Sequence, residues 1–499
     1  MRESEAAART VNAHPVRVSR IALALIVFAF GVSSLSAQTL SRCNFYASPT
    51  GRGDGKSPEK PFRVDSFWLR AAPGQTLCLL DGTYEDAVSM ISPPAGLRGA
   101  QGSPITIRAL HDGKVLLNGH GMRVPVRLHK NDWFVVEGVN ACCSSGTVVW
   151  IDKSSHNVIR RTAAWDAAEG NYEIFGVHFG NHNLLEDVAG WGIARKTYQS
   201  SQGGNFTTIR RAWGRWEGSH VTGPKMVYTL AYNNYDMLVE NSLGTWSGEK
   251  MKESYVLLDY HGKPYVGRLE GTYRNHDVNQ PYAVFGMDAL TKDKSKRANA
   301  RLLGSIAYIT AKDVFKAKRL VFVTKLDAVE IADTLAYIEQ GSYPEVWTFG
   351  LYGLPSLETS LKLHWPPGLA RSSGFQGSTS SSGGSDGVRL LARNLTSFGG
   401  AGPFIAKEWE TRNILRGSAP SVYGPTENVF TATRGAKLCY RYVDGVHTRE
   451  PLWPWPMNQR ILDATVQSGR LPVDINATIE KLVGKIPQAC LGIPTRSDP

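Results

Sequence analysis

A short pattern returns four times in the middle of the chain, and it restricts the folds that the sequence can adopt. The copies are NVIRRTAAWD (157–166), NLLEDVAGWG (183–192), TTIRRAWGRW (207–216) and DMLVENSLGTW (236–246). Their aliphatic anchors, Ile159, Leu185, Ile209 and Val239, follow one another at steps of 26, 24 and 30 residues. Self-similarity at a fixed period of this order indicates stacked repeat units.

Each copy alternates apolar and polar residues, which predicts a short strand, and no copy keeps a helical period. Units that contact only their neighbours stack equivalent inward residues from coil to coil. We therefore expect the four anchors to form one aliphatic column. A second, ragged aromatic column would consist of Trp165, Trp191, Trp213 or Trp216, and Trp246. A β-propeller is excluded because its blades need about 40 residues or more.

The stretches before the repeat resemble a known group of proteins. They read FYASPTGRGDGKSPEKPF (45–62), PGQTLCLLDGTYED (73–86) and GSPITIRALHDGKVLLNG (102–119). They are similar to the entry into the right-handed parallel β-helix of the pectate-lyase-like superfamily. The resemblance implies an all-β chain, a right-handed parallel β-helix, over roughly residues 43–340. Lyases, glycoside hydrolases, epimerases and viral depolymerases share this fold, so it does not name a substrate.

The N-terminus has the order of a secretory signal, which we place at residues 1–37. Arg17 and Arg20 precede the apolar run IALALIVFAFGVSSL, and the small residues Ser36 and Ala37 follow it. The alternative, an uncleaved membrane anchor, needs about 20 apolar residues, and the strongly apolar part is shorter. No later segment is apolar enough to span a membrane. The protein is therefore expected to be secreted or periplasmic.

We place the parallel β-helix domain at residues 38–420. Residues 370–387, ARSSGFQGSTSSSGGSDG, predict a long Ser/Gly-rich surface loop within it. Residues 421–499 form a C-terminal extension that packs on the solenoid or caps its open end. DINATIEKLVG (474–484) has helical spacing and suits such a cap, because the last coil of a solenoid is an exposed edge.

Six cysteines suit an oxidising compartment, and none has zinc-site spacing. We predict disulfides between Cys43 and Cys78 and between Cys439 and Cys490. The adjacent Cys142 and Cys143 cannot readily bond each other without strain, and two buried thiols are the alternative.

The formal charge of +12 indicates an anionic partner. For an exported protein an acidic polysaccharide is the expected one, and no nucleic-acid-binding module is recognisable. We expect a monomer. The sequence has no H-E-x-x-H and no G-x-S-x-G, so zinc-protease and α/β-hydrolase functions lack their central motif.

Acidic and basic residues fall at equivalent places after the anchors. They are Asp166, then Arg195 and Lys196, then Trp216, Glu217 and His220, then Glu249, Lys250 and Lys252. In stacked coils, about 4.8 Å apart, these positions share one face. Arg215 and Tyr198 lie within reach of the same region.

Such a face suits β-elimination on a uronic-acid polymer, which needs a base, a cation for the carboxylate and an acid for the departing oxygen. The resemblance implies a Lys or Arg base, often with calcium as the cation. We predict Lys196 as the base, with Lys250 second, and His220 or Tyr198 as the acid. The predicted substrate-binding residues are Arg195 and Arg215 for carboxylates, Trp216 as a stacking platform, and Glu217.

Several alternatives stay open. Calcium has weak candidate ligands in Asp166 and Asp187, but the run of aspartates that a dedicated site shows is missing. A glycoside hydrolase of the same fold requires two carboxylates, which Glu217 and Glu249 would supply. A non-catalytic, glycan-binding envelope protein is the third possibility, because charged residues outside a solenoid often form only a solvated surface.

Overall fold

The computed structural model describes most of the chain from Cys43 onward. The described residues are 43–246, 258–259, 261–264, 283–288, 298–309, 318–324, 326, 328–338, 346–352, 356–364, 375–378, 389–398, 438–483 and 485–491. Residues 43–499 form one compact unit. The predicted signal, residues 1–37, lies outside the described residues.

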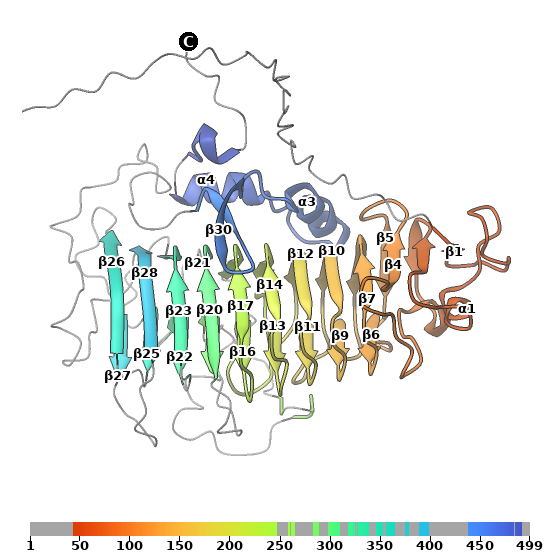
Figure 1. Cartoon of the computed structure of the whole chain (residues 1–499), viewed down its shortest axis with the longest axis horizontal. Coiled ribbons are helices and arrows are strands. Elements are labelled where there is room, and N and C mark those ends of the chain that lie inside the picture. Colours follow the sequence, from red (N-terminus) through yellow and green to blue (C-terminus); the bar gives the residue numbers. More distant parts are fainter. Residues whose placement is uncertain are drawn as a thin grey trace, which may run out of the picture. The chain divides into compact units, whose positions relative to one another are not determined.

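Parallel strands stacked coil upon coil build the described part (Figure 1). The larger sheet, sheet A, contains β1 (Phe45–Ala47), β2 (Thr76–Leu79), β3 (Gly82–Tyr84), β4 (Ile105–Ala109), β5 (Val115–Asn118), β7 (Phe134–Glu137), β8 (Val139–Cys142), β10 (Val158–Trp165), β12 (Leu184–Trp191), β14 (Thr208–Arg210), β15 (Trp213–Arg215), β17 (Met237–Glu240), β18 (Leu243–Trp246), β20 (Asn299–Leu303), β21 (Ile306–Ile309), β23 (Ala328–Ala332), β24 (Leu335–Ile338), β26 (Ser356–His364) and β28 (Arg389–Phe398).

The second sheet, sheet B, contributes one strand to each successive coil. Its members are β6 (Val126–His129), β9 (Val149–Asp152), β11 (Glu173–His178), β13 (Lys196–Ser201), β16 (Met226–Ala231), β19 (Ala283–Asp288), β22 (Lys318–Thr324), β25 (Val346–Tyr352) and β27 (Phe375–Ser378). Each strand pairs in parallel with its equivalent in the next coil, as β11 does with β13 and β13 with β16. The predicted parallel β-helix is confirmed.

The aliphatic column of the repeat is confirmed in register. Ile159 pairs with Leu185, Leu185 with Ile209, and Ile209 with Val239. All four side chains lie in the central hydrophobic core. Because equivalent residues of paired parallel strands point to the same face, this register stacks the four anchors in one column inside the solenoid.

The aromatic column differs from the prediction. Trp165 and Trp191 stack with ring centroids 5.1 Å apart, and Trp213 follows at 5.8 Å. These three rings pack in a separate cluster with the C-terminal extension, whereas Trp216 and Trp246 lie in the central core. The cause is a residue with positive φ inside each repeat, such as Arg161 at 47° in β10, which breaks the alternation.

Sheet B places a second row of stacked rings inside the solenoid. Phe175, Tyr198, Tyr228 and Phe285 pair in register in consecutive coils. Their ring centroids are 5.0, 4.7 and 4.6 Å apart, at the offset-stacking distance of aromatic pairs. Gly214 leaves room for this row, because a Cβ there would lie 3.0 Å from a ring carbon of Tyr198 and 2.5 Å from the Val227 side chain.

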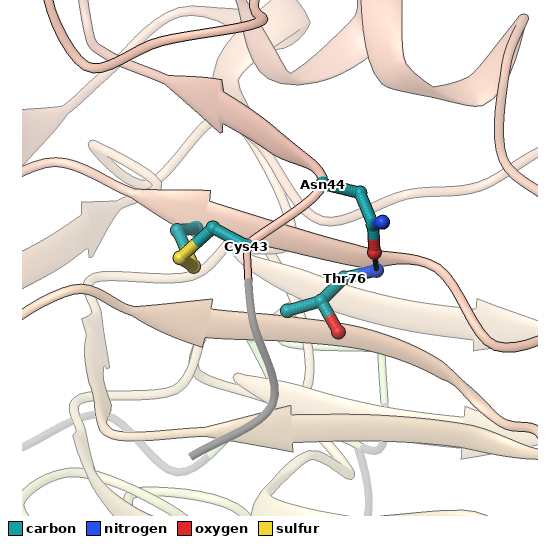
Figure 2. The surroundings of a disulfide bond; sticks show 4 residues. Cys43, Asn44 and Thr76 are labelled. Atoms are coloured by element: carbon teal, nitrogen blue, oxygen red, sulfur yellow. Dashed lines mark hydrogen bonds between the residues drawn. A yellow bond between two sulfur atoms is a disulfide. The ribbon is translucent and has the colours of Figure 1, made fainter.

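Both predicted disulfides are present. Cys43 and Cys78 join the first two strands at the start of the solenoid, with Cα atoms 5.6 Å apart (Figure 2). Next to them, the Asn44 side-chain oxygen accepts a hydrogen bond from the Thr76 backbone N–H at 2.8 Å. Cys439 and Cys490 close the C-terminal extension, with Cα atoms 4.5 Å apart.

The described part of the extension lies along the side of the coils (Figure 1). It contains the hairpin β29 (Tyr440–Val443) and β30 (Val446–Pro451), α3 (Asn458–Gln467), α4 (Ile475–Val483) and a short turn of 3-10 helix at Gln488–Leu491. Among the described residues, the other helical segments are α1 (Val64–Trp68) and the 3-10 turn Ala87–Ser89, both near the start of the described chain.

Contacts with middle coils hold the extension in place. Asn241 exchanges two hydrogen bonds with the Tyr442 backbone, at 2.6 and 2.9 Å. Arg460 donates to the carbonyl of Arg161, and the Trp191 ring N–H donates to Ser468. Of the two arrangements left open by the sequence, the described extension therefore packs on the solenoid. The helix predicted within 474–484 is α4, and it packs with Trp165 and Trp191 in the side cluster.

The structure also describes part of the predicted Ser/Gly-rich loop, and it gives the lengths of the described helices. Residues 375–378 form β27 and pair with β25, so the loop predicted at 370–387 is wrong for these four residues. Among the described helices, none combines the length and hydropathy of a membrane span.

Candidate active site

The outer face of sheet B carries Lys196, the residue that the sequence predicts as the base. Lys196 opens β13 and pairs in register with Glu173, which opens β11. Tyr198 points into the core, so its neighbour Gln199 points outward. The Lys196 ammonium donates to the Gln199 side-chain oxygen, and the Gln199 amide donates to Ser201 Oγ at 2.6 Å. Lys196 therefore belongs to a polar row on the outer face.

This lysine is held in a dry environment, because only 3% of it is exposed. The pKa of Lys196 is lowered from its usual 10.5 to about 7, because burial and, to a smaller extent, the neighbouring charge of Arg195 lower it more than Glu173 raises it. A cation loses its hydration on burial and gives up its proton more readily. Near neutral pH the amine is thus available to accept a proton.

Glu173 is the carboxylate that the sequence reasoning missed. It is 1% exposed, and Thr147 Oγ1 donates to its Oε2 at 2.7 Å. His178 is the last residue of β11, and its Nε2 lies 3.9 Å from Oε2 of Glu173. The repeat pattern lies on sheet A strands, so it does not align the starts of β11 and β13. The aligned rings Phe175 and Tyr198 were the signal that places Glu173 beside Lys196.

The structure removes two predicted residues from the site. Tyr198 is fully buried in the interior ring stack, its hydroxyl donates to the Trp213 carbonyl at 2.8 Å, and burial raises its pKa. Trp216 is also fully buried, and its ring N–H donates to the Ala194 carbonyl at 2.9 Å. The predictions of Tyr198 as an acid and of Trp216 as a sugar platform are therefore wrong, because both side chains belong to the core.

Arg215, Glu217 and Asp166 meet in an ion-pair chain that the extension completes. Arg215 Nε donates to Glu217 Oε1 at 2.7 Å, and Arg470 Nε donates to Glu217 Oε2 at 3.0 Å. Arg470 also reaches Asp166 Oδ1 at 3.0 Å. Burial raises the pKa of Asp166, against the hydrogen bond from the Ile193 N–H. These side chains bind one another, and the substrate-binding roles of Arg215 and Glu217 stay predictions.

Arg195 lies in the turn that leads into β13, and His220 lies in the loop between β15 and β16. His220 Nδ1 lies 2.8 Å from Glu169 Oε1, and both side chains are partly exposed. The Arg195 guanidinium donates to Asn171 Oδ1, and Arg195 is 5% exposed. Arg195 is adjacent to Lys196 in the chain, so these two of the predicted residues stay together. Lys250, Glu249 and Lys252 lie outside the described residues.

The two candidate calcium ligands, Asp166 and Asp187, bind arginine side chains and do not fit a calcium ion. Arg211 holds Asp187 at 2.7 and 2.9 Å, and Arg470 holds Asp166. The pKa of Arg211 is raised by both neighbouring carboxylates, Asp187 and Glu186, although its burial opposes them. In the part of the chain that the structure describes, no three His, Cys, Asp or Glu side chains gather as metal ligands. We derive no step through a metal.

Comparison with known proteins gives remote likenesses only. No family model matches the chain, and no curated protein matches its sequence. Among solved structures, pectate lyase Pel9A is 15% identical with a TM-score of 0.44, covering 75% of this chain and 81% of that one. An alginate lyase from Paenibacillus sp. str. FPU-7 is 13% identical with a TM-score of 0.36, covering 67% and 96%.

A third solved structure has another activity in its name. The lacto-N-biosidase GH136 from Eubacterium ramulus is 10% identical with a TM-score of 0.26, covering 72% of this chain and 68% of that one.

Proposed function

We propose that the protein is an exported lyase that cleaves an acidic, uronic-acid-containing polysaccharide by β-elimination, with Lys196 as the base. The observation that carries the proposal is the buried amine of Lys196, whose pKa of about 7 suits proton abstraction at neutral pH. The two disulfides and the signal predicted at residues 1–37 support export.

The proposed reaction uses a single proton abstraction. The neutral Lys196 amine takes the proton from the sugar carbon that bears the carboxylate. The electron pair left behind forms a carbon–carbon double bond as the bond to the bridging oxygen breaks. That oxygen leaves with a proton, so the products are an unsaturated sugar at one new end and an alcohol at the other. Because Lys196 is 3% exposed, substrate binding must uncover the amine.

Charge stabilisation and proton supply are assigned to neighbouring residues. Arg195, beside Lys196 in the chain, is the proposed cation for the substrate carboxylate. One of two histidines is proposed to protonate the departing oxygen. His220 is the acid chosen from the sequence, and His178 lies on the face of sheet B that holds Lys196 and Glu173.

The rival hydrolase loses support from the same geometry. Hydrolysis requires one free carboxylate and one protonated carboxyl group across the bond. Glu217 is 7% exposed and its two oxygens bind Arg215 and Arg470. Its predicted partner, Glu249, lies outside the described residues. A non-catalytic glycan-binding protein remains as an outcome of the test.

The test is to incubate the purified full chain with a panel of uronic-acid polymers and to follow the ultraviolet absorbance of the unsaturated product. We expect absorbance to rise with one acidic polymer of the panel. For Lys196→Ala we expect kcat to fall by about 10²–10⁴-fold, the usual contribution of a general base. Lys196→Met, which keeps the side-chain volume, should lose the same activity.

The matched control is Lys153→Ala, since Lys153 is an exposed lysine that follows β9, two coils away from β13. This variant should keep full activity. Reducing ends without ultraviolet absorbance would support a hydrolase instead, and binding without turnover on any polymer would support the glycan-binding alternative. Full activity of a folded Lys196→Met variant would refute Lys196 as the base.

A further inference from the structure

Two cysteines outside the proposed active site stand side by side. Cys142 ends β8 and Cys143 follows it, and their sulfur atoms are 2.7 Å apart. Two sulfur atoms that only touch stay farther apart than this, and a disulfide bond is about 2.05 Å long. The structure holds both as free thiols. Their sulfurs nevertheless lie within a short movement of bonding distance.

The backbone around this pair is fixed by the coils on either side. The Cys142 carbonyl accepts a hydrogen bond from the Gly119 N–H at 2.9 Å, and the Cys143 carbonyl accepts one from the Gly121 N–H at 2.6 Å. The Cys143 N–H donates to the Trp165 carbonyl at 3.2 Å. Cys143 has a φ of 57°, the left-handed region that few side chains adopt. The backbone therefore holds the Cα atoms of the two cysteines in place, and rotation of the side chains is the movement that brings the sulfur atoms together.

The two thiols differ in environment. Cys142 is 3% exposed and packs in the cluster under the C-terminal extension, whereas Cys143 is half-buried. The hydrogen bond with Cys142 lowers the pKa of the Cys143 thiol, burial and the charge of Asp166 oppose this shift, and Arg470 supports it. The same hydrogen bond and burial raise the pKa of Cys142. Cys143 is thus the thiol that reacts first.

We propose that Cys142 and Cys143 form a vicinal disulfide, a reversible redox site at the junction of β8 and the C-terminal extension. The oxidant is a small-molecule disulfide such as oxidised glutathione. The Cys143 thiolate attacks one glutathione sulfur and releases one glutathione. Cys142 then attacks the mixed disulfide at the Cys143 sulfur and releases the second. Two protein thiols are oxidised, one glutathione disulfide is reduced, and the two protons leave with the two glutathiones.

This bond differs in kind from the other two disulfides. Adjacent Cα atoms are about 3.8 Å apart across a trans peptide, below the usual disulfide range of about 4.4–6.8 Å. Such a bond is strained and easily reduced. The pairs Cys43–Cys78 and Cys439–Cys490 span 35 and 51 residues, so they restrict the unfolded chain far more. The vicinal pair therefore suits reversible reduction rather than stabilisation of the fold.

The experiment treats the full chain with oxidised glutathione, alkylates it under denaturing, non-reducing conditions, and maps the peptides by mass spectrometry. We expect the peptide with residues 142–143 to be unalkylated and two hydrogen atoms lighter than its dithiol form. In a stepwise titration with dithiothreitol, two thiols per chain should appear first, both in this peptide. The unfolding temperature should change little at that step and fall only when the longer disulfides open.

The control is Cys143→Ser, which leaves Cys142 as a single thiol. After the same treatment we expect one alkylated or glutathionylated cysteine and no lighter peptide. The proposal is overturned if Cys142 and Cys143 of the wild type are both alkylated after oxidation, or if a stable glutathione adduct remains on Cys143. It is equally overturned if the longer disulfides open first.

Discussion

Ionisation of Lys196 controls the proposed chemistry at the scale of single residues. The base acts as the neutral amine, and its pKa of about 7 lies below the usual 10.5. We therefore expect kcat/KM on the cleaved polymer to rise about tenfold per pH unit up to about pH 7 and then to level. An ordinary exposed lysine would instead keep the rate rising toward pH 10.

The measurement is a pH profile of kcat/KM, corrected for the stability of the protein at each pH. Removing Glu173, which opposes the shift, tests the assignment. In Glu173→Gln we expect the rising limb to move to lower pH, because the remaining influences, burial and Arg195, both lower the pKa of Lys196. If the rising limb of the pH profile stays at the same pH in Glu173→Gln, the group that titrates is not Lys196.

A Tyr198→Phe variant tests whether the buried Tyr198 hydroxyl takes part in the reaction. Tyr198→Phe keeps the ring in its stack with Phe175 and Tyr228 and deletes the hydroxyl that donates to Trp213. We expect activity close to that of the wild type and a loss of about 1–3 kcal/mol in unfolding free energy, because the carbonyl loses its partner. Denaturant unfolding and the polymer assay measure the two effects. A large fall in kcat with unchanged stability would restore Tyr198 as an acid.

At the scale of secondary-structure elements, the repeat predicts sheet A well and sheet B poorly. The sheet A strands β10 and β12 both begin directly after an asparagine, Asn157 and Asn183, so Ile159 and Leu185 align in the sequence. The sheet B strands follow turns of variable length, and their starts do not align in the sequence. Since Glu173 and Lys196 both open sheet B strands, a prediction that finds Lys196 from the repeat misses Glu173.

The bends in sheet A explain the wrong predictions about tryptophan. Alternation counted from Ile159 assigns each later position to one face. Arg161, inside β10, has a positive φ and interrupts this alternation. Trp165 therefore lies outside the central core and packs against the C-terminal extension. No composition or spacing rule signals such a residue when it is Arg161 rather than glycine.

The extension is attached by an arginine that the sequence did not indicate. Arg470 joins Asp166 of one coil to Glu217 two coils further on. Removing it leaves a nearly buried Glu217 with only Arg215, so we expect Arg470→Ala to lower the free energy of unfolding by about 1–3 kcal/mol. Denaturant unfolding followed by tryptophan fluorescence measures the loss, because Trp165, Trp191 and Trp213 lie under the extension.

Arg449→Ala is the control for that variant, since Arg449 is an exposed arginine on β30 of the same extension. It should change the unfolding free energy by less than about 0.5 kcal/mol. Equal losses in both variants would mean that the ion-pair chain contributes nothing beyond the general charge of the extension.

At the scale of the whole molecule, the fold follows from the sequence more directly than the chemistry does. Each coil contacts mainly its neighbours, so one recognisable repeat predicts the architecture of the rest. The chemistry depends on side chains from different coils that meet only when the register is known. Asp166 and Glu217 illustrate this, because Arg470, more than 250 residues after Glu217 in the chain, decides that they are paired.

The net charge of +12 gives a prediction about the polymer as a whole. If long-range attraction draws an acidic glycan to the solenoid, salt must weaken binding, because the screening length falls from about 10 Å at 0.1 M to about 3 Å at 1 M. We expect Kd for the acidic polymer to rise by at least about tenfold over this range, measured by titration calorimetry with Lys196→Met to prevent cleavage. A neutral polymer should show no such change. An acidic polymer bound equally at both salt concentrations would show that recognition is local, and the basic balance of the chain would then carry no information about its substrate.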